Sequence, residues 1–458
     1  MPVVSPGKHF KSITSSLQAG ILKPDGRDFR DYIFIRFEAR AKAHALRVFL
    51  RDTIGKQVTS HHQQESDTVK FRAARKENRD HAGMAIVNLG LSYAGFRKIS
   101  TGRYRHNHPG DLGFRSGMFG RRSRLHDYYA YKGSKKTVED VFIRPSNRRD
   151  GKRPIHMVLT VGHSTAEGVE QKVAELRKLL DDRREQLIAD YFIQRGFQKR
   201  NPVSGAVTTP LGFEEGFSNK ISTQLILDRI LVREHWTYGS SDTAYGTYMA
   251  FRKIEVDESV FAERVRALRY QIQFEREATE EQRTALAEAL FMGRFRNGTP
   301  LLLNNAALPP QYWRVGSQDA PLDYSVDADG LRCPFGAHVR RMNPRGTEER
   351  QIVIMRRGMR YQEPDGGPSG LLFVSFQRSI TDQFEVLFDR MKVAGNYDAI
   401  AYRPEVDDAS KYDNYFTVEK RYDDRVGRVK VEIGGHALTK FRGGEYFYLP
   451  SLPYLNGL

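Results

Sequence analysis

The stretch GLLFVSFQRSITDQFE, residues Gly370 to Glu385, decides the fold. Its first part, Leu371 to Gln377, is a short run rich in Leu, Val and Phe, which predicts a buried strand. The apolar residues from Phe384 to Met391 then recur at helical spacing, and either Ser379 or Thr381 can cap that helix. A strand followed at once by a one-sided apolar helix predicts a sheet with a helix on one face.

The same order of strand and helix recurs along the chain. Ser164 and Glu167 have the spacing of a capping box, which predicts a charged helix that continues towards Tyr191. Asp257 or Ser259 is expected to cap another helix with a one-sided apolar stripe. Further strands are expected at Tyr32 to Phe37, Met84 to Leu89, Ile155 to Val161 and Tyr248 to Val256. We therefore predict an α+β fold of two ferredoxin-like domains, which are duplicated antiparallel sheets with helices on one face.

The length of 458 residues is more than one ordinary domain needs. A loop rich in Gly, Pro, Ser and Thr runs from Asn201 to Lys220 and is a plausible junction. We expect an N-terminal domain over residues 1–210, with a basic insertion at about 115–153, and a C-terminal domain over residues 211–458.

Composition excludes several classes of protein. Hydrophobic residues make up 39% and charged residues 28%, which is the balance of a soluble globular chain. No apolar run is long enough to span a bilayer and the N-terminus lacks a secretory signal, so we expect a cytoplasmic protein. The single cysteine, Cys333, excludes an internal disulfide and a multi-cysteine metal site, so redox chemistry would need a bound cofactor.

The formal charge of +17 indicates an anionic partner without identifying it. Between Arg115 and Arg153 there are twelve Lys and Arg residues against four Asp and Glu. Tyr128, Tyr129 and Tyr131 interleave with this segment, as aromatic residues do on nucleic-acid surfaces. Two readings stay open, a basic surface for an anionic partner such as nucleic acid and a solvated insertion.

One histidine of the thirteen has unusual neighbours. The stretch CPFGAHVRRMNPR, Cys333 to Arg345, places His338 between small apolar residues and a basic cluster. Small neighbours admit a bulky planar ligand, and Arg340, Arg341 and Arg345 can neutralise the two carboxylates of a haem. A structural or surface histidine beside arginines is the alternative reading of the same pattern.

At this motif a resemblance to the dye-decolorizing peroxidase family becomes visible, and it extends from end to end. The matching blocks occur in the family's order. They are LQAGILKPDGR (Leu17 to Arg27), VNLGLSYAGFRKI (Val87 to Ile99), FRSGM (Phe114 to Met118), LGFEEG (Leu211 to Gly216), YGTYMAFRKIE (Tyr245 to Glu255), MGRFRNGTPLLL (Met292 to Leu303), IMRRGMRY (Ile354 to Tyr361), the stretch from Gly370 to Glu385, and GGEYFYLPSL (Gly443 to Leu452).

The resemblance implies haem b held mainly by the C-terminal domain. His338 would be the axial ligand of the haem iron, and Arg341 would meet a propionate. Leu371 and Phe373 would line the side of the haem that receives peroxide. The implied activity is oxidation of dyes and phenolic or other aromatic compounds by hydrogen peroxide, through compound I.

The same resemblance makes Arg356 the distal arginine and Glu215 the distal acid. A carboxylate can move the proton between the peroxide oxygens, and a fixed guanidinium can stabilise the charge that develops as the O–O bond breaks. The chain departs from the family here, since the family has aspartate where this chain has Glu215 in Gly212 to Gly216. One extra methylene moves the carboxylate by about 1 Å, a displacement that can cost on the order of a hundredfold in rate.

Several outcomes therefore stay open. Glu215 can take over proton transfer, Arg356 can do most of the work with a water molecule, or the chain can bind haem without efficient turnover. The last possibility is the alternative function, a haem-binding or haem-handling protein with weak peroxidase turnover. It is also possible that Glu214, and not Glu215, is the carboxylate that points into the site. A homo-oligomer is a further possibility.

Overall fold

The computed structural model describes most of the chain. The described residues are 13–77, 83–101, 108–127, 154–215, 223–235, 244–271, 279–304, 323–343, 352–391, 400, 415–422, 425–432 and 437–458. Most of the basic segment expected at 115–153, including Tyr128, Tyr129 and Tyr131, lies outside these residues, as do Arg345 and both tryptophans.

The first half of the chain forms a four-stranded antiparallel unit. Its strands are β1 (Phe29–Phe37), β2 (Ile86–Leu91), β3 (Met157–His163) and β4 (Ile188–Phe197). They lie in the order β2-β3-β1-β4, so the fourth strand pairs with the first, the first with the third and the third with the second. This order and the intervening helices are those of a ferredoxin-like unit, as predicted from the sequence.

The second half repeats this arrangement. Its four main strands are β8 (Tyr245–Val256), β10 (Met359–Gln362), β11 (Ser369–Gln377) and β14 (Thr439–Leu449). Again the fourth strand pairs with the first, the first with the third and the third with the second. The short strands β7 (Val232–Arg233) and β9 (Met355–Arg356) extend β8 and β11. Two hairpins stand apart, β5 (Lys199–Arg200) with β6 (Val207–Thr208), and β12 (Tyr415–Tyr422) with β13 (Arg425–Glu432).

The two half-sheets close into one barrel. Tyr448 of β14 pairs with Leu91 of β2, and Arg360 of β10 pairs with Phe197 of β4. The strands therefore run in a ring, β2-β3-β1-β4-β10-β11-β8-β14 and back to β2. Because side chains alternate along a strand, the ring has an inner and an outer face.

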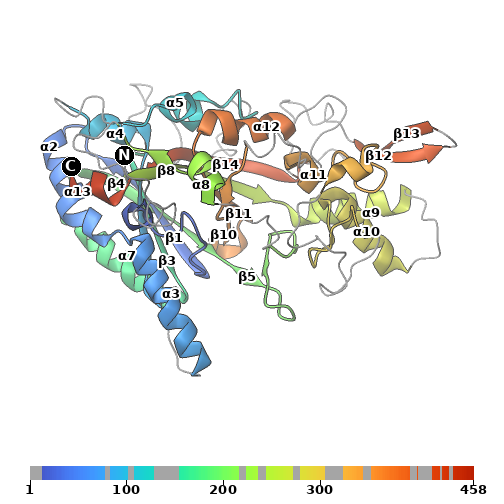
Figure 1. Cartoon of the computed structure of the whole chain (residues 1–458), viewed down its shortest axis with the longest axis horizontal. Coiled ribbons are helices and arrows are strands. Elements are labelled where there is room, and N and C mark those ends of the chain that lie inside the picture. Colours follow the sequence, from blue (N-terminus) through green and yellow to red (C-terminus); the bar gives the residue numbers. More distant parts are fainter. Residues whose placement is uncertain are drawn as a thin grey trace, which may run out of the picture.

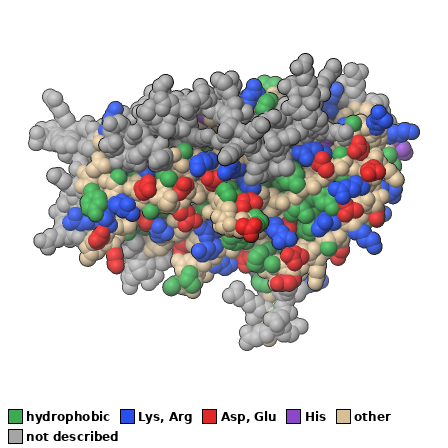
Figure 2. Space-filling view, turned by 180° about the vertical axis from the view of Figure 1, so that it is seen from behind, with side chains coloured by type: hydrophobic (Ala, Val, Ile, Leu, Met, Phe, Trp, Pro, Cys, Tyr) green, Lys and Arg blue, Asp and Glu red, His purple; other side chains and the backbone are tan. Residues whose placement is uncertain are grey.

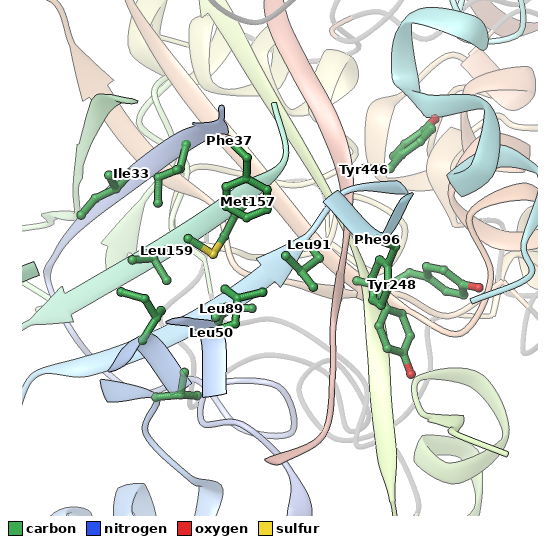
Figure 3. Packing of buried hydrophobic residues seen from close by; sticks show 14 of the residues in the cluster. Ile33, Phe37, Leu50, Leu89, Leu91, Phe96, Met157, Leu159, Tyr248 and Tyr446 are labelled. Carbon is green, nitrogen blue, oxygen red and sulfur yellow. The ribbon is translucent and has the colours of Figure 1, made fainter. Parts of the chain in front are cut away.

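Each face of the ring has its own apolar cluster. The inner face holds Phe34 and Phe251, whose ring centroids are 4.9 Å apart. The outer face carries residues of both halves, among them Leu89 and Leu159 from the first half and Tyr446 from the second, and Figure 3 shows this cluster. Burial of these side chains is the main favourable contribution to folding.

Helices surround the ring. They are α2 (Ala43–Phe49), α3 (His61–Lys76), α4 (Tyr93–Ile99), α5 (Leu112–Gly120), α7 (Ala166–Asp181), α8 (Thr223–Arg229), α9 (Glu258–Gln271), α10 (Glu280–Met292), α11 (His338–Met342), α12 (Glu385–Met391) and α13 (Leu452–Asn456). Among them α2, α4, α5, α7, α12 and α13 pack on the outer face, α8 packs against the inner cluster, and α9 and α10 form a third apolar cluster. Single π-helical turns precede or follow two of them, η1 (Leu50–Ile54) and η8 (Ile380–Phe384). In Figure 1, α5, α12 and α11 follow one another along one side of β14.

Predicted helix ends were partly wrong. Ser379 does cap the turn before α12, because its side chain accepts a hydrogen bond from the backbone N of Asp382. The helix after β3, however, is capped by Thr165 instead of Ser164 and ends at Asp181. Glu185 then adopts a φ of 64°, which a helix does not allow, so Tyr191 lies in β4.

The charges on the visible surface are mixed. On the face seen in Figure 2, basic and acidic side chains are interspersed among the described residues. None of the helices formed by the described residues is long and apolar enough to cross a bilayer.

Candidate functional site

The strand register places three of the predicted site residues on one face. Leu371 and Phe373 are two positions apart in β11, so their side chains point to the same face. This is the outer face, where both are partly buried. Arg356 of β9 lies directly opposite Ser375 of β11 and therefore shares that face. Arg356 is exposed. The outer face of the second half-sheet thus presents a cation beside two apolar side chains.

His338 is held above this sheet by a short, well-anchored helix. It is the first residue of α11, is partly buried, and follows Ala337, which is fully buried. Arg340 fixes the turn, since its guanidinium donates to the Asp327 carboxylate at 2.7 Å and to the Cys333 carbonyl at 2.6 Å. Arg340 therefore has a structural role and is unsuited to bind a propionate.

The backbone before α11 is fixed by the same aspartate. The Asp327 carboxylate also accepts from the backbone N of Arg332 and of Cys333, at 3.0 Å each. A Cβ at Gly293, which has a φ of 90°, would approach the Val339 Cβ at 3.2 Å, so glycine permits the close contact between the end of α10 and α11. These contacts limit how far the imidazole at 338 can move.

Helix α12 connects His338 to the sheet. Arg341 is partly buried and donates to the carbonyl of Arg390 in α12. The preceding π-helical turn brings Phe384 to 6.2 Å from the Phe373 ring, measured between ring centroids. The histidine, the arginine and the β11 side chains predicted for one site are therefore joined through η8 and α12.

The two carboxylates of the Gly212 to Gly216 motif have different surroundings. Glu214 is buried, and its carboxylate accepts from the Asn201 amide at 2.7 Å and the Ser204 hydroxyl at 2.6 Å. Glu215 is exposed, and its backbone N donates to the Val207 carbonyl at 2.7 Å. Glu214 thus anchors the loop to the β5–β6 hairpin, which leaves the Glu215 carboxylate as the one available for chemistry.

An arginine that the sequence reasoning did not single out interacts electrostatically with both the predicted acid and the predicted arginine. Arg294 donates to the carbonyl of Glu214. Burial and the nearby charge of Arg356 lower the pKa of Arg294 to about 10, while Glu215 and Glu214 act in the opposite direction. Arg294 is therefore within electrostatic reach of both Arg356 and Glu215. It belongs to the block Met292 to Leu303, but one arginine among many gave no signal of its own.

A buried ion pair forms part of the same face. Arg252 of β8 is opposite Phe373 in the register and donates to both carboxylate oxygens of Asp127, at 2.7 and 2.9 Å. Its guanidinium also lies 4.6 Å from the Phe388 ring centroid and 4.0 Å from that of Phe441. An arginine with this many partners stiffens the wall of the site and has little freedom to bind a ligand.

A haem-ligating imidazole usually donates its other ring N–H to an acceptor such as a carboxylate. Asp382 and Glu385 are candidates for this acceptor, but both have other roles in the structure. Glu385 is fully buried and forms an ion pair with Arg121. Asp382 is exposed and interacts with Ser379 at the start of η8. Asp407 and Asp408 lie outside the described residues.

Comparison with known proteins gives matches to dye-decolorizing peroxidases and to deferrochelatases. The model of the C-terminal part of Dyp-type peroxidases matches residues 302–406, a range that contains His338, Arg356 and Phe373. The multifunctional dye peroxidase DyP2 of an Amycolatopsis species is 30% identical over 242 residues. That alignment covers 47% of this chain and 49% of the relative. A deferrochelatase of Yersinia pestis is 26% identical over 188 residues, which cover 40% of this chain and 36% of that protein.

Solved structures extend the likeness in fold to nearly the whole chain. The structure of DyP2 from Amycolatopsis has a TM-score of 0.76 and 22% identity, covering 98% of this chain and 97% of that one. The DyP-type peroxidase of Anabaena has a TM-score of 0.75 and 24% identity, covering 98% and 95%. At these identities the likeness shows the fold, which confirms the predicted pair of ferredoxin-like units. The family model, the curated relatives and the solved structures all indicate a DyP-type peroxidase.

Proposed function

We propose that the chain is a haem peroxidase that uses hydrogen peroxide to oxidise aromatic or phenolic compounds, including dyes. The observation that carries the proposal is the register of β9 and β11, which sets Arg356 and Phe373 on the sheet face that α12 connects to His338. The alignment with the curated relative DyP2 covers only about half of that protein's length. The proposed activity therefore rests on this geometry and on the likeness to DyP-type peroxidases.

The residues present fit a haem. An imidazole is a common axial ligand of haem iron, and the propionates need cationic partners such as Arg341. The face between them offers apolar side chains, Leu371 and Phe373. In addition, the Ser375 hydroxyl on this face is fully buried and makes no hydrogen bond within the described part of the chain. Such a group is costly unless something else, such as a ligand or water, satisfies it.

In this proposal each residue has one task. His338 holds the iron of haem b, Arg341 binds a propionate, and Leu371 and Phe373 keep the peroxide side dry. Haem, when bound, supplies the two-electron chemistry that cleaves the O–O bond. The protein supplies orientation and electrostatics, which are the usual contributions of a protein to cofactor chemistry.

Glu215 and Arg356 act on peroxide itself. The Glu215 carboxylate accepts the proton from one peroxide oxygen and returns it to the other, which leaves as water. The Arg356 guanidinium stabilises negative charge on the departing oxygen. The exposed position of both side chains lets small peroxide molecules reach them.

The test compares single-site variants of haem-loaded protein in steady-state oxidation of an anthraquinone dye and a phenol. Arg356→Leu should lower kcat/KM for peroxide by about 100- to 1,000-fold, because it removes a preorganised charge. Glu215→Gln should cost about 100-fold or more, while Glu215→Asp should retain activity, because the carboxylate is kept. Native activity in Arg356→Leu would refute the role of that arginine.

A second function is favoured by specific observations. The deferrochelatase relatives, together with glutamate at position 215, support a haem-handling protein with weak peroxide turnover. Full haem loading with negligible turnover, restored by Glu215→Asp, would favour this alternative. We further propose that the two domains meet between residues 210 and 211. The proposal also includes a cytoplasmic location, a homo-oligomer and an anionic partner.

A further inference from the structure

The loop that carries Glu215 is fixed by contacts that do not use the Glu215 side chain. The Glu214 carboxylate is bound by Asn201 and Ser204, and the backbone N of Glu214 donates to the Arg296 carbonyl at 2.7 Å. One further group, the Glu214 carbonyl, belongs to the peptide that leads directly to Glu215. That carbonyl accepts a hydrogen bond from the guanidinium of Arg294.

Arg294 and Arg296 are two residues apart but differ in their charge partners. Arg296 is bound bidentately by Glu288, at 2.6 and 2.7 Å, so its charge is neutralised locally. Arg294 instead lies near Glu215 and near the like charge of Arg356. Both guanidinium groups lie over the Phe213 ring, 5.7 and 5.6 Å from its centroid. The two arginines therefore pack similarly on one ring, and only Arg294 faces the charged groups of the site.

We propose that Arg294 is a positioning residue for peroxide chemistry: it holds the peptide that carries Glu215 and sets the electrostatic balance between Glu215 and Arg356. The inference rests on the proposed function. The hydrogen bond acts on the backbone, so it fixes the peptide that precedes residue 215 whether the side chain there is glutamate or aspartate. The charge of Arg294 interacts with both Glu215 and Arg356, so Arg294 affects the electrostatic environment of each.

The first experiment measures kcat/KM for peroxide in haem-loaded variants. Arg294→Met should lower it by about 10- to 100-fold, while the KM of the dye stays unchanged. Arg294→Lys should recover part of the loss, because it restores the charge. The matched control Arg296→Met should change the rate by less than about 3-fold, although it removes an arginine from the same ring.

A double-mutant cycle separates positioning from a merely structural role. If Arg294 acts through Glu215, Arg294→Met should have less than about 3-fold effect when Glu215 is already Gln, because coupled residues are not additive. Equal losses in the native and Glu215→Gln backgrounds would overturn the proposal.

A second cycle uses the haem-free protein and urea unfolding at low ionic strength, where charge interactions are least screened. Arg356→Leu should raise the urea midpoint of the native chain, since it removes a like charge beside Arg294, and should not raise it in Arg294→Met. The same shift in both backgrounds would contradict the electrostatic part of the proposal. If native protein lacks peroxide turnover, the proposed function fails, whereas this cycle still tests Arg294.

Discussion

The outer faces of the two half-sheets have the same strand order and different side chains. In the first half, Ile33 and Leu159 are fully buried and pack in the same cluster as Leu176 and Leu180 of α7. In the second half, the face holds Tyr446 at one end and Arg252 beside Phe373 further along the strands. The first face is mainly aliphatic and packs under α7, whereas the second carries the charged and aromatic side chains of the proposed haem site. In this proposal, the difference between a core and a site lies in the side chains and not in the topology.

If this comparison is right, only the second half should bind haem. His338→Ala should abolish haem binding or lower it by more than about 100-fold, because it removes the proposed axial ligand of the iron. His163→Ala is the matched control, since His163 ends β3 of the first half and its ring nitrogens contact Thr165 and the Gly83 carbonyl. Absorbance in the Soret region after haem addition measures haem binding in both variants.

Unchanged haem content in His338→Ala would remove the axial assignment. Equal loss in both variants would show that the absorbance follows folding and not ligation, so thermal unfolding of the haem-free variants should be recorded alongside.

The two halves also differ in how much of their structure can be predicted from the sequence. The strands of the first half could be predicted, because continuous apolar runs such as Ile155 to Val161 are unambiguous. Closure of the barrel could not, because it depends on single pairings, Tyr448 with Leu91 and Arg360 with Phe197, between distant edges. The end of α7 was misplaced because the charged residues before Glu185 look helical, while the backbone turns there.

In the second half, the candidate site residues were predicted from the family motifs, and the register shows that Arg356, Leu371 and Phe373 share a face. Arg294 and Arg252 were missed for a physical reason. In a chain with 73 Lys and Arg residues, only three-dimensional neighbours distinguish an arginine at a site from one on the surface.

Core substitutions should separate stability from haem binding. Leu159→Ala removes a fully buried side chain of the first half and should lower the free energy of unfolding by about 2–5 kcal/mol. Phe373→Ala, at the partly buried position in the second half, should cost less stability and should weaken haem binding. Urea unfolding of haem-free protein and haem titration measure the two effects. A Leu159→Ala protein that folds but fails to bind haem would contradict the division of roles.

A buried acid of the second half should make stability depend on pH. Burial raises the pKa of Glu234 from 4.5 to about 7, although hydrogen bonds from Ser451 act in the opposite direction. A carboxyl whose pKa is higher in the folded state stabilises the fold when protonated, so this contribution is present below about pH 4.5 and is lost as pH rises through 7. Between pH 5 and pH 8.5 the loss should be on the order of 2–3 kcal/mol.

Glu234→Gln should flatten this dependence in urea unfolding at several pH values. Asp31→Asn in the first half is the comparison, since the pKa of Asp31 is raised to about 6 by burial, so its contribution should be smaller and be lost at lower pH. Other buried acids contribute as well, such as Glu445, whose pKa burial also raises to about 7. The comparison of native chain and variant is therefore decisive: a pH dependence that Glu234→Gln leaves unchanged would show that the Glu234 carboxyl is not buried as described.

The smallest expected effect has opposite signs in the two halves. Ser375 in the second half is fully buried, with a hydroxyl that makes no hydrogen bond to the described residues, so Ser375→Ala should stabilise the haem-free protein by about 1 kcal/mol. Ser92 in the first half is also buried, but its hydroxyl donates to the Ile155 carbonyl at 2.6 Å and caps α4. Ser92→Ala should therefore destabilise by about 1–2 kcal/mol. Urea midpoints of both variants measure these changes. A loss of stability in Ser375→Ala would mean that the Ser375 hydroxyl already has a hydrogen-bond partner in the haem-free fold. The polar groups of the second face would then be satisfied without a ligand, as those of the first face are.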